Sequence, residues 1–278
     1  MGSVRIAAVQ MDVRLGDRAG NLQGILEHLD RAADAGAQLI AFPECVLTGY
    51  CFDSREEALS LAETIPGPST DRLASACAER GVSIIVGLLE RDGDRLYNAC
   101  ALIGPKGVIG SYRKIHLPFI GVDRFVDPGD RPFTVHEAAG LRIGMHICYD
   151  GVFPESGRVL SLLGADLLAL PTNWPKGAEA QAEHLSAMRA MENVVYAMAI
   201  DRVGLERGFQ FIGRSSIADP SGGYLAFASK DQEEILLAEI DPARARNKRI
   251  VRVPGKAELD RIADRRPDFY GPITSETL

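Results

Sequence analysis

The sequence predicts an α/β fold in which strands and helices alternate along the chain. Two observations support this prediction. Short apolar or β-branched runs recur, and segments with apolar residues at helical spacing lie between several of them; the runs cover residues 3–10, 38–42, 82–89, 141–147 and 165–170. In addition, 46% of the 278 residues are hydrophobic, which is enough for a large buried core.

The first β-α-β unit is predicted over residues 3–42. Residues 3–10 form a strand rich in β-branched side chains, and Asn21 is a suitable helix cap before apolar residues that recur at helical spacing as far as Ala33. Gly36 ends this helix, and residues 38–42 return to the sheet. The crossover between the two strands is expected to be right-handed.

Residues 69–131 are predicted to form a helix followed by a meander of strands. Ser69 and Asp71 open the helix and Gly81 ends it. Strands follow over residues 82–89, 95–103 and 108–113, with turn sequences between them. Because the chain reverses at each turn, the sheet is predicted to be mixed rather than purely parallel. Residues 121–131 form a loop.

The second half of the chain continues the alternation to residue 240. The predicted elements are strands over residues 133–136 and 141–147, a helix over 155–163, a buried strand over 165–170, a helix over 179–192, a strand over 194–200, a hairpin of 209–218 with 224–228, and a strand over 234–240. No linker or repeat divides the sequence, so we predict a single domain over residues 1–278. The segment from about residue 244 has no obvious core of its own and is expected to pack on this body or at a subunit interface.

Charge and cysteine content exclude several classes of protein. The net charge of −7 argues against nucleic acid or an anionic membrane as a partner, and no apolar run reaches the roughly 18 residues of a membrane span. Five irregularly spaced cysteines do not form a disulfide framework, so the cytoplasm is the expected compartment. Zinc-type Cys-x-x-Cys pairs are missing and the histidines are scattered, so we expect no metal and no cofactor.

Three strands are followed by residues that carry chemistry. Glu44 follows the strand over residues 38–42, Lys114 follows the strand over 108–113, and Cys148 ends the strand over 141–147. The carboxyl ends of such strands form the ligand crevice of α/β sheets. The turn at Asp150 and the helix start at Pro154 place Cys148 where a helix is about to begin, which favours a thiolate. Taken singly, a buried apolar cysteine and an ordinary salt bridge are the simpler explanations.

These stretches together resemble the nitrilase superfamily, the carbon–nitrogen hydrolases with a Glu-Lys-Cys triad. The matching text is Phe42-Pro43-Glu44, Tyr112-Arg113-Lys114-Ile115-His116-Leu117-Pro118, and Ile147-Cys148-Tyr149-Asp150 with Phe153-Pro154-Glu155. The order and spacing match as well, over nearly the whole chain. The resemblance implies a four-layer α-β-β-α sandwich with two mixed sheets, and a homodimer or higher homo-oligomer.

The resemblance also implies a role for each residue of the triad. Cys148 would be the nucleophile, forming a thioester while ammonia leaves. Glu44 would be the general base, with its pKa raised by burial. Lys114 would stay cationic and, with the backbone amide of Tyr149, stabilise the tetrahedral oxyanion. The three groups are expected to titrate as a coupled set.

The chain departs from the family at one position. The family usually has a second glutamate in the loop after the lysine, whereas this chain offers Asp123, which is one methylene shorter; a solvated turn aspartate is the alternative. Tyr50, Asn173 and Trp174 each follow a strand end and are expected to line the pocket, although Trp174 could equally belong to the core. His116 and His146 are interpreted as hydrogen-bonded structural histidines.

The residues around the cysteine indicate a substrate class. Nitrilases proper usually carry Cys-Trp-Glu, whereas this chain has Cys148-Tyr149-Asp150, which looks more like the amidase and carbamoyl-amidase branches. Asp150 and Gly151 stand where hydrolases of N-carbamoyl amino acids carry arginines, and acidic residues near the mouth (Asp123, Asp150) would tolerate an amine-bearing substrate. We predict hydrolysis of a small linear, aliphatic or ω-type amide by water. The alternatives are an N-carbamoyl amine or amino acid amidohydrolase, then a nitrilase, and, outside enzymes, a binding protein that retains the fold.

Overall fold

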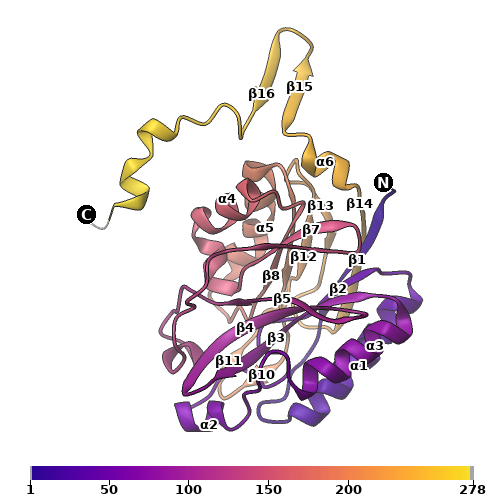
Figure 1. The fold of residues 1–278 in the computed structure, drawn as a ribbon, viewed down its shortest axis with the longest axis vertical. Coiled ribbons are helices and arrows are strands. Elements are labelled where there is room, and N and C mark those ends of the chain that lie inside the picture. Colours follow the sequence, from indigo (N-terminus) through magenta and orange to yellow (C-terminus); the bar gives the residue numbers. More distant parts are fainter. Residues whose placement is uncertain (1, 276–278) are drawn as a thin grey trace.

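The computed structural model describes residues 2–275 and contains two six-stranded sheets (Figure 1). In spatial order, the first sheet consists of β14 (Glu234–Ile240), β1 (Val4–Gln10), β2 (Leu39–Ala41), β3 (Ser83–Asp92), β4 (Arg95–Gly104) and β5 (Gly107–Arg113). The second consists of β13 (Tyr224–Phe227), β12 (Ser216–Ala218), β9 (Tyr196–Ile200), β8 (Leu167–Pro171), β7 (Leu141–Met145) and β6 (Val135–Ala138).

Both sheets are mixed, as predicted. In the first sheet β1, β2 and β3 are parallel, and in the second β7, β8 and β9 are parallel. The other neighbours within these two sheets pair antiparallel. Since β4 reverses the direction of β3 and β5 reverses it again, the end of β5 and the start of β4 lie at the same sheet edge as the end of β3.

Helices cover the outer face of each sheet, so the predicted four layers are confirmed. Helices α1 (Arg18–Asp34) and α3 (Pro68–Arg80) pack on the first sheet, and α4 (Pro154–Leu162) and α5 (Glu179–Asn193) pack on the second (Figure 1). The main apolar core lies between the sheets, where residues such as Ile6, Ile85 and Leu102 of one meet Ile143, Leu167 and Met198 of the other. Among residues 2–275 no helix is long and apolar enough to cross a bilayer.

The start of α1 differs from the prediction. Asp17, not Asn21, is the N-cap, and its side chain accepts a hydrogen bond from the amide of Gly20 at 2.9 Å. Asn21 lies inside the helix and is buried, where its side chain donates to the carbonyl oxygens of Arg14 (2.7 Å) and Leu47 (3.2 Å). An asparagine is a good cap, but the side chain of this one instead binds two loops, the one before the helix at Arg14 and the one after β2 at Leu47.

Two further local predictions were incomplete. The short helix α2 (Arg55–Leu59), capped by Ser54, was not predicted. The expected strand over residues 209–218 is divided into β11 (Phe209–Gln210), which pairs with β10 (Leu205–Glu206), and β12. Left-handed backbone at Gly213 (φ 57°) and Arg214 (φ 61°) interrupts the extended conformation between them.

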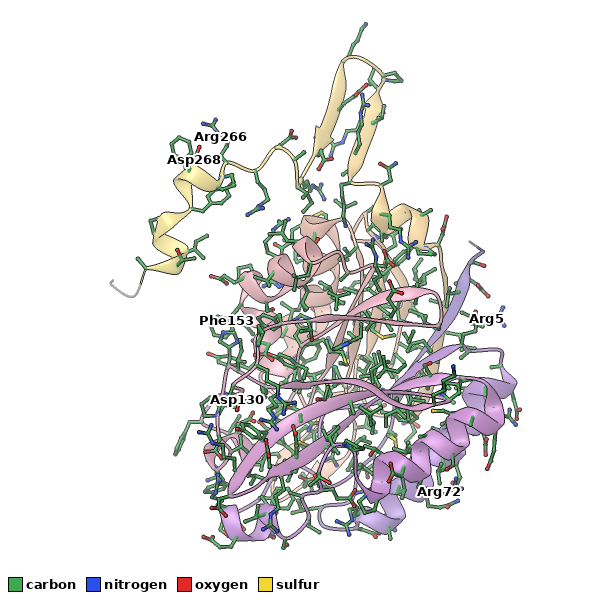
Figure 2. All side chains as sticks on the ribbon, in the orientation of Figure 1. Arg5, Arg72, Asp130, Phe153, Arg266 and Asp268 are labelled. Atoms are coloured by element: carbon green, nitrogen blue, oxygen red, sulfur yellow. The ribbon has the colours of Figure 1, made fainter. Side chains whose placement is uncertain are left out.

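The C-terminal segment leaves the body after α6 (Pro242–Arg246). The hairpin β15 (Arg249–Val253) and β16 (Ala257–Asp260) stands away from the two sheets, and the short helices η3 (Pro267–Phe269) and η4 (Gly271–Thr274) follow (Figure 1). Figure 2 shows Arg266 and Asp268 on this projecting segment, clear of the main body. Within it Val251, Val253, Phe269 and Ile273 are exposed, whereas Ala245 of α6 is fully buried.

Candidate active site

A buried cluster of charged side chains lies where the first sheet ends. The Nζ atom of Lys114 donates hydrogen bonds to Oε1 of Glu44 (2.7 Å) and to Oδ2 of Asp123 (2.5 Å), and all three side chains are inaccessible to solvent. Lys114 follows β5, whose last residue, Arg113, is held to Glu90 of β3 by two hydrogen bonds of 2.6 and 2.8 Å. That buried ion pair holds the end of β5, and so the start of Lys114, against β3.

A glycine in the neighbouring strand lets Glu44 approach the cluster. Glu44 lies three residues after β2, and its backbone passes directly over Gly87 of β3. A Cβ atom at Gly87 would lie 2.5 Å from both the carbonyl oxygen of Pro43 and the amide nitrogen of Cys45. Because any other residue would push this segment outward, Gly87 sets the position of the Glu44 backbone.

Asp123 is part of the cluster and is not a solvated turn residue. It lies in the 3-10 turn η1 (Gly121–Arg124) and is only 4% exposed. Its Oδ2 also accepts the hydroxyl of Tyr50 at 2.8 Å. Gly121 has a left-handed backbone (φ 53°), and a Cβ there would overlap the Tyr50 ring, so glycine allows the loop to close over this side chain.

Cys148 begins the 3-10 turn η2 (Cys148–Val152) just beyond β7. Its backbone is left-handed (φ 45°), which is uncommon for a residue with a side chain. Asp150 closes the turn: its carboxylate accepts the amide of Ile147 (2.9 Å), the hydroxyl of Tyr112 (2.8 Å) and the ring Nδ1 of His116 (2.7 Å). The prediction that Asp123 and Asp150 lie near the mouth is therefore wrong, because both carboxylates are buried, and that of Asp150 holds the cysteine turn in place.

The environment of Cys148 disfavours the thiolate, contrary to the expectation from the nearby helix start. Burial raises its pKa above the ordinary value, and the negative charge of Glu44 raises it further. Lys114, the Thr172 hydroxyl and the Asn173 backbone amide act in the opposite direction. Within residues 2–275 no hydrogen bond joins this thiol to Glu44 or Lys114, so the sulfur senses both charges without contacting them.

The pKa values of Glu44 and Lys114 are both raised. Burial raises the pKa of Glu44, and the neighbouring Asp123 raises it further, while Lys114 opposes the shift. Burial opposes the charge on Lys114, but Asp123 and Glu44 outweigh that effect and keep its pKa above the ordinary value. The lysine is thus a permanent cation, and the glutamate is a stronger base than an exposed one.

The residues after β8 complete the site from the second sheet. Asn173 donates from Nδ2 to the backbone carbonyl of Glu44 at 2.9 Å, which joins the two sheet ends. Within residues 2–275 five buried side-chain oxygens have no hydrogen-bond partner, and three of them belong to residues of this site: Oε2 of Glu44, Oγ1 of Thr172 and Oδ1 of Asn173. Buried polar atoms are normally paired, so this group indicates a place for a polar ligand.

Trp174 and Tyr149, two aromatic residues predicted for the site, differ in their exposure to solvent. Trp174 is 4% exposed and packs within the core between the sheets, and its backbone amide donates to Asp201 at 2.9 Å. Tyr149 is 38% exposed, and its ring contacts Phe153 edge-on at 5.2 Å. As the second residue of η2, Tyr149 has a backbone amide for which the turn itself provides no acceptor.

The two nearby histidines are bonded to fixed partners. His146 is buried, its Nδ1 lies 3.0 Å from the Ser156 hydroxyl, and burial lowers its pKa to about 4. His116 pairs with Asp150 and stacks on Phe153 with ring centroids 3.9 Å apart. Among residues 2–275, no group of three or more His, Cys, Asp and Glu side chains is arranged to hold a metal ion.

Sequence reasoning missed two parts of the site. Asn98, near the start of β4, donates to both Glu44 and Asp123. It is a polar residue within an otherwise apolar stretch of the strand, and that isolation was a usable signal because a buried amide requires partners. The second part is Glu206, whose Oε1 accepts the amides of Tyr50 (2.7 Å) and Cys51 (2.5 Å). No local pattern in the sequence indicates that contact.

Residues 5–250 match the family model described as carbon-nitrogen hydrolase. The chain belongs to this family. A protein named nitrilase from Pyrococcus abyssi is 42% identical over 96% of this chain and 99% of its own length. An omega-amidase from Xenopus tropicalis is 35% identical over 87% of this chain and 90% of its own, and an N-carbamoylputrescine amidase from Solanum lycopersicum is 34% identical over 88% and 86%.

Solved structures of carbon–nitrogen hydrolases share the fold. A mutant of the Nesterenkonia AN1 amidase, described as from the nitrilase superfamily, superimposes with a TM-score of 0.81 at 25% identity and 97% coverage of both chains. Another mutant of that amidase shows covalent addition of the acetamide moiety of fluoroacetamide at the active site cysteine, with a TM-score of 0.79 at 25% identity over 97% of this chain and 96% of its own. The predicted superfamily and fold are confirmed, and the protein is a carbon–nitrogen hydrolase with amidases among its relatives.

Proposed function

We propose that this enzyme hydrolyses the C–N bond of a small linear amide, releasing ammonia and a carboxylic acid through an acyl-enzyme on Cys148. This proposal rests on the hydrogen bonding of the Glu44 carboxylate. Oε1 accepts hydrogen bonds from Lys114 and Asn98, both at 2.7 Å, whereas Oε2 is buried without a partner. A base whose second oxygen is held free in a dry site is prepared to take a proton.

The first half-reaction makes the thioester. Oε2 of Glu44 takes the proton from the Cys148 sulfur as that sulfur bonds to the carbonyl carbon, and the C=O electron pair moves onto oxygen. Lys114 uses two of its three N–H groups on Glu44 and Asp123, which leaves the third for the oxyanion. The backbone amide of Tyr149 is the second donor. When the oxyanion collapses, the C–N bond breaks and Glu44 returns its proton to the leaving nitrogen.

The second half-reaction releases the acid. Glu44, deprotonated again, takes a proton from water as the water oxygen attacks the thioester carbon. The same two donors hold the new oxyanion. Its collapse breaks the C–S bond, the sulfur regains a proton from Glu44, and the carboxylic acid leaves. The unpartnered oxygens of Thr172 and Asn173 are suited to accept N–H groups of the amide.

Charge in the site favours an uncharged reacting end of the substrate. Two carboxylates face one ammonium beside a neutral thiol, so a substrate carboxylate close to the reacting carbon would be repelled. The guanidinium of Arg189, beside the cysteine turn, is occupied by the carbonyl oxygens of Gly151 (2.8 Å) and Val152 (3.0 Å) and by Glu192 (2.8 Å). This supports a neutral amide over a carboxylated N-carbamoyl amino acid.

A comparison of three neutral or amine-bearing substrates tests the reaction class. Ammonia release is measured with butyramide, N-carbamoylputrescine and butyronitrile at equal concentrations. We expect butyramide to have the highest kcat/KM, with N-carbamoylputrescine as the first alternative. Fastest turnover of the nitrile would overturn the amidase proposal in favour of a nitrilase. Cys148→Ala is the control and is expected to abolish release from all three.

Labelling with fluoroacetamide tests the nucleophile. Intact-mass and peptide analysis should find one modified cysteine at Cys148 and none in Cys148→Ala, because Cys148 is 9% exposed whereas the other four cysteines are at most 3% exposed. Burial also raises the pKa of Cys51 and Cys77 to about 12. Labelling at another cysteine, with butyramide hydrolysis retained in Cys148→Ala, would contradict the assignment.

We also propose that the chain is one folding unit and works as a homodimer in the cytoplasm. The segment from about residue 244, the C-terminal arm, packs at the subunit interface. Apolar side chains are exposed on helices α4 and α5 and on the arm: Val159, Leu162, Leu163, Met188, Phe269 and Ile273. Exposed apolar side chains of this size favour a second copy as their cover. Light scattering should give twice the chain mass, and Leu163→Glu should give the monomer; a monomeric parent protein would overturn the proposal.

A further inference from the structure

The side-chain amide of Asn98 lies between the two carboxylates of the site. Its Nδ2 donates one hydrogen bond to Oε1 of Glu44 (2.7 Å) and one to Oδ1 of Asp123 (2.9 Å). The residue is 1% exposed, so both N–H groups are committed to these two acceptors. A neutral side chain therefore joins two groups of like charge that would otherwise repel each other.

Asn98 and Lys114 together close a ring of hydrogen bonds. Both nitrogens bind Oε1 of Glu44, and they bind separate oxygens of Asp123, Oδ1 and Oδ2. Two donors on Oε1 fix the plane of the Glu44 carboxylate. With Lys114 alone, the group could turn about its last bond and exchange its two oxygens. With both donors present, Oε2 is held without a partner within residues 2–275.

The amide oxygen of Asn98 also has a hydrogen-bond partner. Its Oδ1 accepts the thiol of Cys45 at 3.4 Å, and Cys45 immediately follows Glu44 in the chain. Burial raises the pKa of Cys45 well above its ordinary value, so this sulfur remains a thiol and keeps its proton to donate. Carboxylates only accept hydrogen bonds, so the NH₂ group of Asn98 faces Glu44 and Asp123, and the amide oxygen then faces the Cys45 thiol.

We propose that Asn98 is a positioning residue for the hydrolysis: it orients Glu44 so that one oxygen alone faces the nucleophile and the substrate nitrogen. This inference rests on the proposed function, in which Glu44 transfers the protons. It assigns to Asn98 no contact with the substrate. Its contribution is to keep the base in one rotational state throughout both half-reactions, which is a form of preorganisation.

The proposal predicts a defined electrostatic effect. Lys114 and Asp123 are the charged groups that act on Glu44, while Cys45, Tyr50, Cys148 and Asp201 sense its charge in turn. The Asn98 hydrogen bond stabilises the ionised form of Glu44 and so lowers its pKa. Loss of this donor should raise the apparent pKa on the acid limb of the kcat/KM profile.

Asn98→Leu is the first test, since leucine matches the volume and donates no hydrogen bond. The probe is butyramide, or N-carbamoylputrescine if that is the better substrate. We expect kcat to fall by about 100-fold with little change in KM, and the acid limb to move up by about one pH unit. An acid limb that stays in place in a folded Asn98→Leu protein would overturn the proposal, whatever the loss of rate.

Two controls separate this proposal from simpler explanations. Asn193→Leu removes a different fully buried asparagine, whose Nδ2 donates to the Arg189 carbonyl (3.0 Å); it should lower Tm without moving the acid limb. Cys148→Ala, measured in parallel, tests the proposed function separately. If that variant retains activity, the acyl-enzyme mechanism fails; if it is inactive while Asn98→Leu keeps the parent pH profile, only the role of Asn98 fails.

The cysteine behind Asn98 provides a milder test if Asn98→Leu does not fold. Cys45→Ala removes the donor that holds the amide oxygen of Asn98, and Cys45→Ser retains one. We expect a several-fold lower kcat and an upward shift of the acid limb in Cys45→Ala, with most of both effects restored in Cys45→Ser. Equal pH profiles for the parent and Cys45→Ala would then overturn the proposal.

Discussion

Replacing Asp123 by asparagine isolates the charge of the second carboxylate while keeping its shape. Asp123 accepts three hydrogen bonds, from Lys114 (2.5 Å), Tyr50 (2.8 Å) and Asn98 (2.9 Å), and its side chain is inaccessible to solvent. An asparagine has one acceptor oxygen in place of two. Whichever way the new amide turns, its NH₂ group faces either Asn98 or the pair of Lys114 and Tyr50, all of which are donors.

The structure sets the size of the expected loss. Breaking a buried ion pair by removing one partner costs about 3–5 kcal/mol. Lys114 keeps Glu44 as a partner at 2.7 Å, which places the ion-pair loss at the low end of that range. The donor left facing another donor adds about 1–3 kcal/mol. Since the two losses arise within one hydrogen-bonded network they are not additive, and we expect Asp123→Asn to lower the free energy of unfolding by about 4 kcal/mol.

The same variant should change the pH dependence of the enzyme in a known direction. The negative charge of Asp123 raises the pKa of Glu44. Removing that charge lowers the pKa of Glu44, so the acid limb of kcat/KM should move to lower pH. This direction is opposite to the one expected for Asn98→Leu, so the two variants check each other.

Chemical denaturation at pH 7 and a kcat/KM profile on the same preparations form the assay. Asp123→Glu is the matched control because it keeps the charge and restores the family's second glutamate. It should leave the acid limb in place and lose about 1–3 kcal/mol of stability, because one methylene is added at a buried position. The reasoning is refuted if the free energy of unfolding of Asp123→Asn lies within about 1 kcal/mol of that of the parent protein, or if its acid limb moves to higher pH.

Two further predictions concern residues that support the site. Burial lowers the pKa of His146 from 6.5 to about 4, so the unfolded chain binds a proton below pH 6.5 that the folded protein does not. The free energy of unfolding should therefore fall by about 3 kcal/mol between pH 6.5 and 4. In His146→Gln this part of the dependence of unfolding free energy on pH should be missing. The same dependence in both proteins would contradict the prediction. Glu206 is paired with buried Arg202 and accepts a hydrogen bond from the Tyr50 amide. Glu206→Gln should therefore lower the free energy of unfolding, measured by urea denaturation, by about 3–5 kcal/mol and reduce kcat/KM. A loss of stability below about 1 kcal/mol would show that the pair is dispensable.

The layered fold could be predicted because its signals are local. Apolar runs of five to eight residues, helical spacing between them and turn residues at their ends placed most strands correctly. The errors occurred where a long-range contact competed with a local preference. Asn21 has the chemistry of a helix cap but binds Leu47, and residues 209–218 have strand composition but are divided at Gly213.

Local sequence was enough to predict that Glu44, Lys114 and Cys148 follow strands, because a strand end is a local event marked by apolar composition and the turn residues after it. The way in which those ends meet depends on the packing of the whole protein. This packing brings Asn98 from the start of β4 between two carboxylates, and it buries Asp150 under the cysteine turn rather than at the mouth. The physical reason is that hydrogen bonds between groups 25 to 54 residues apart depend on strand order and sheet packing, and these are properties of the whole core.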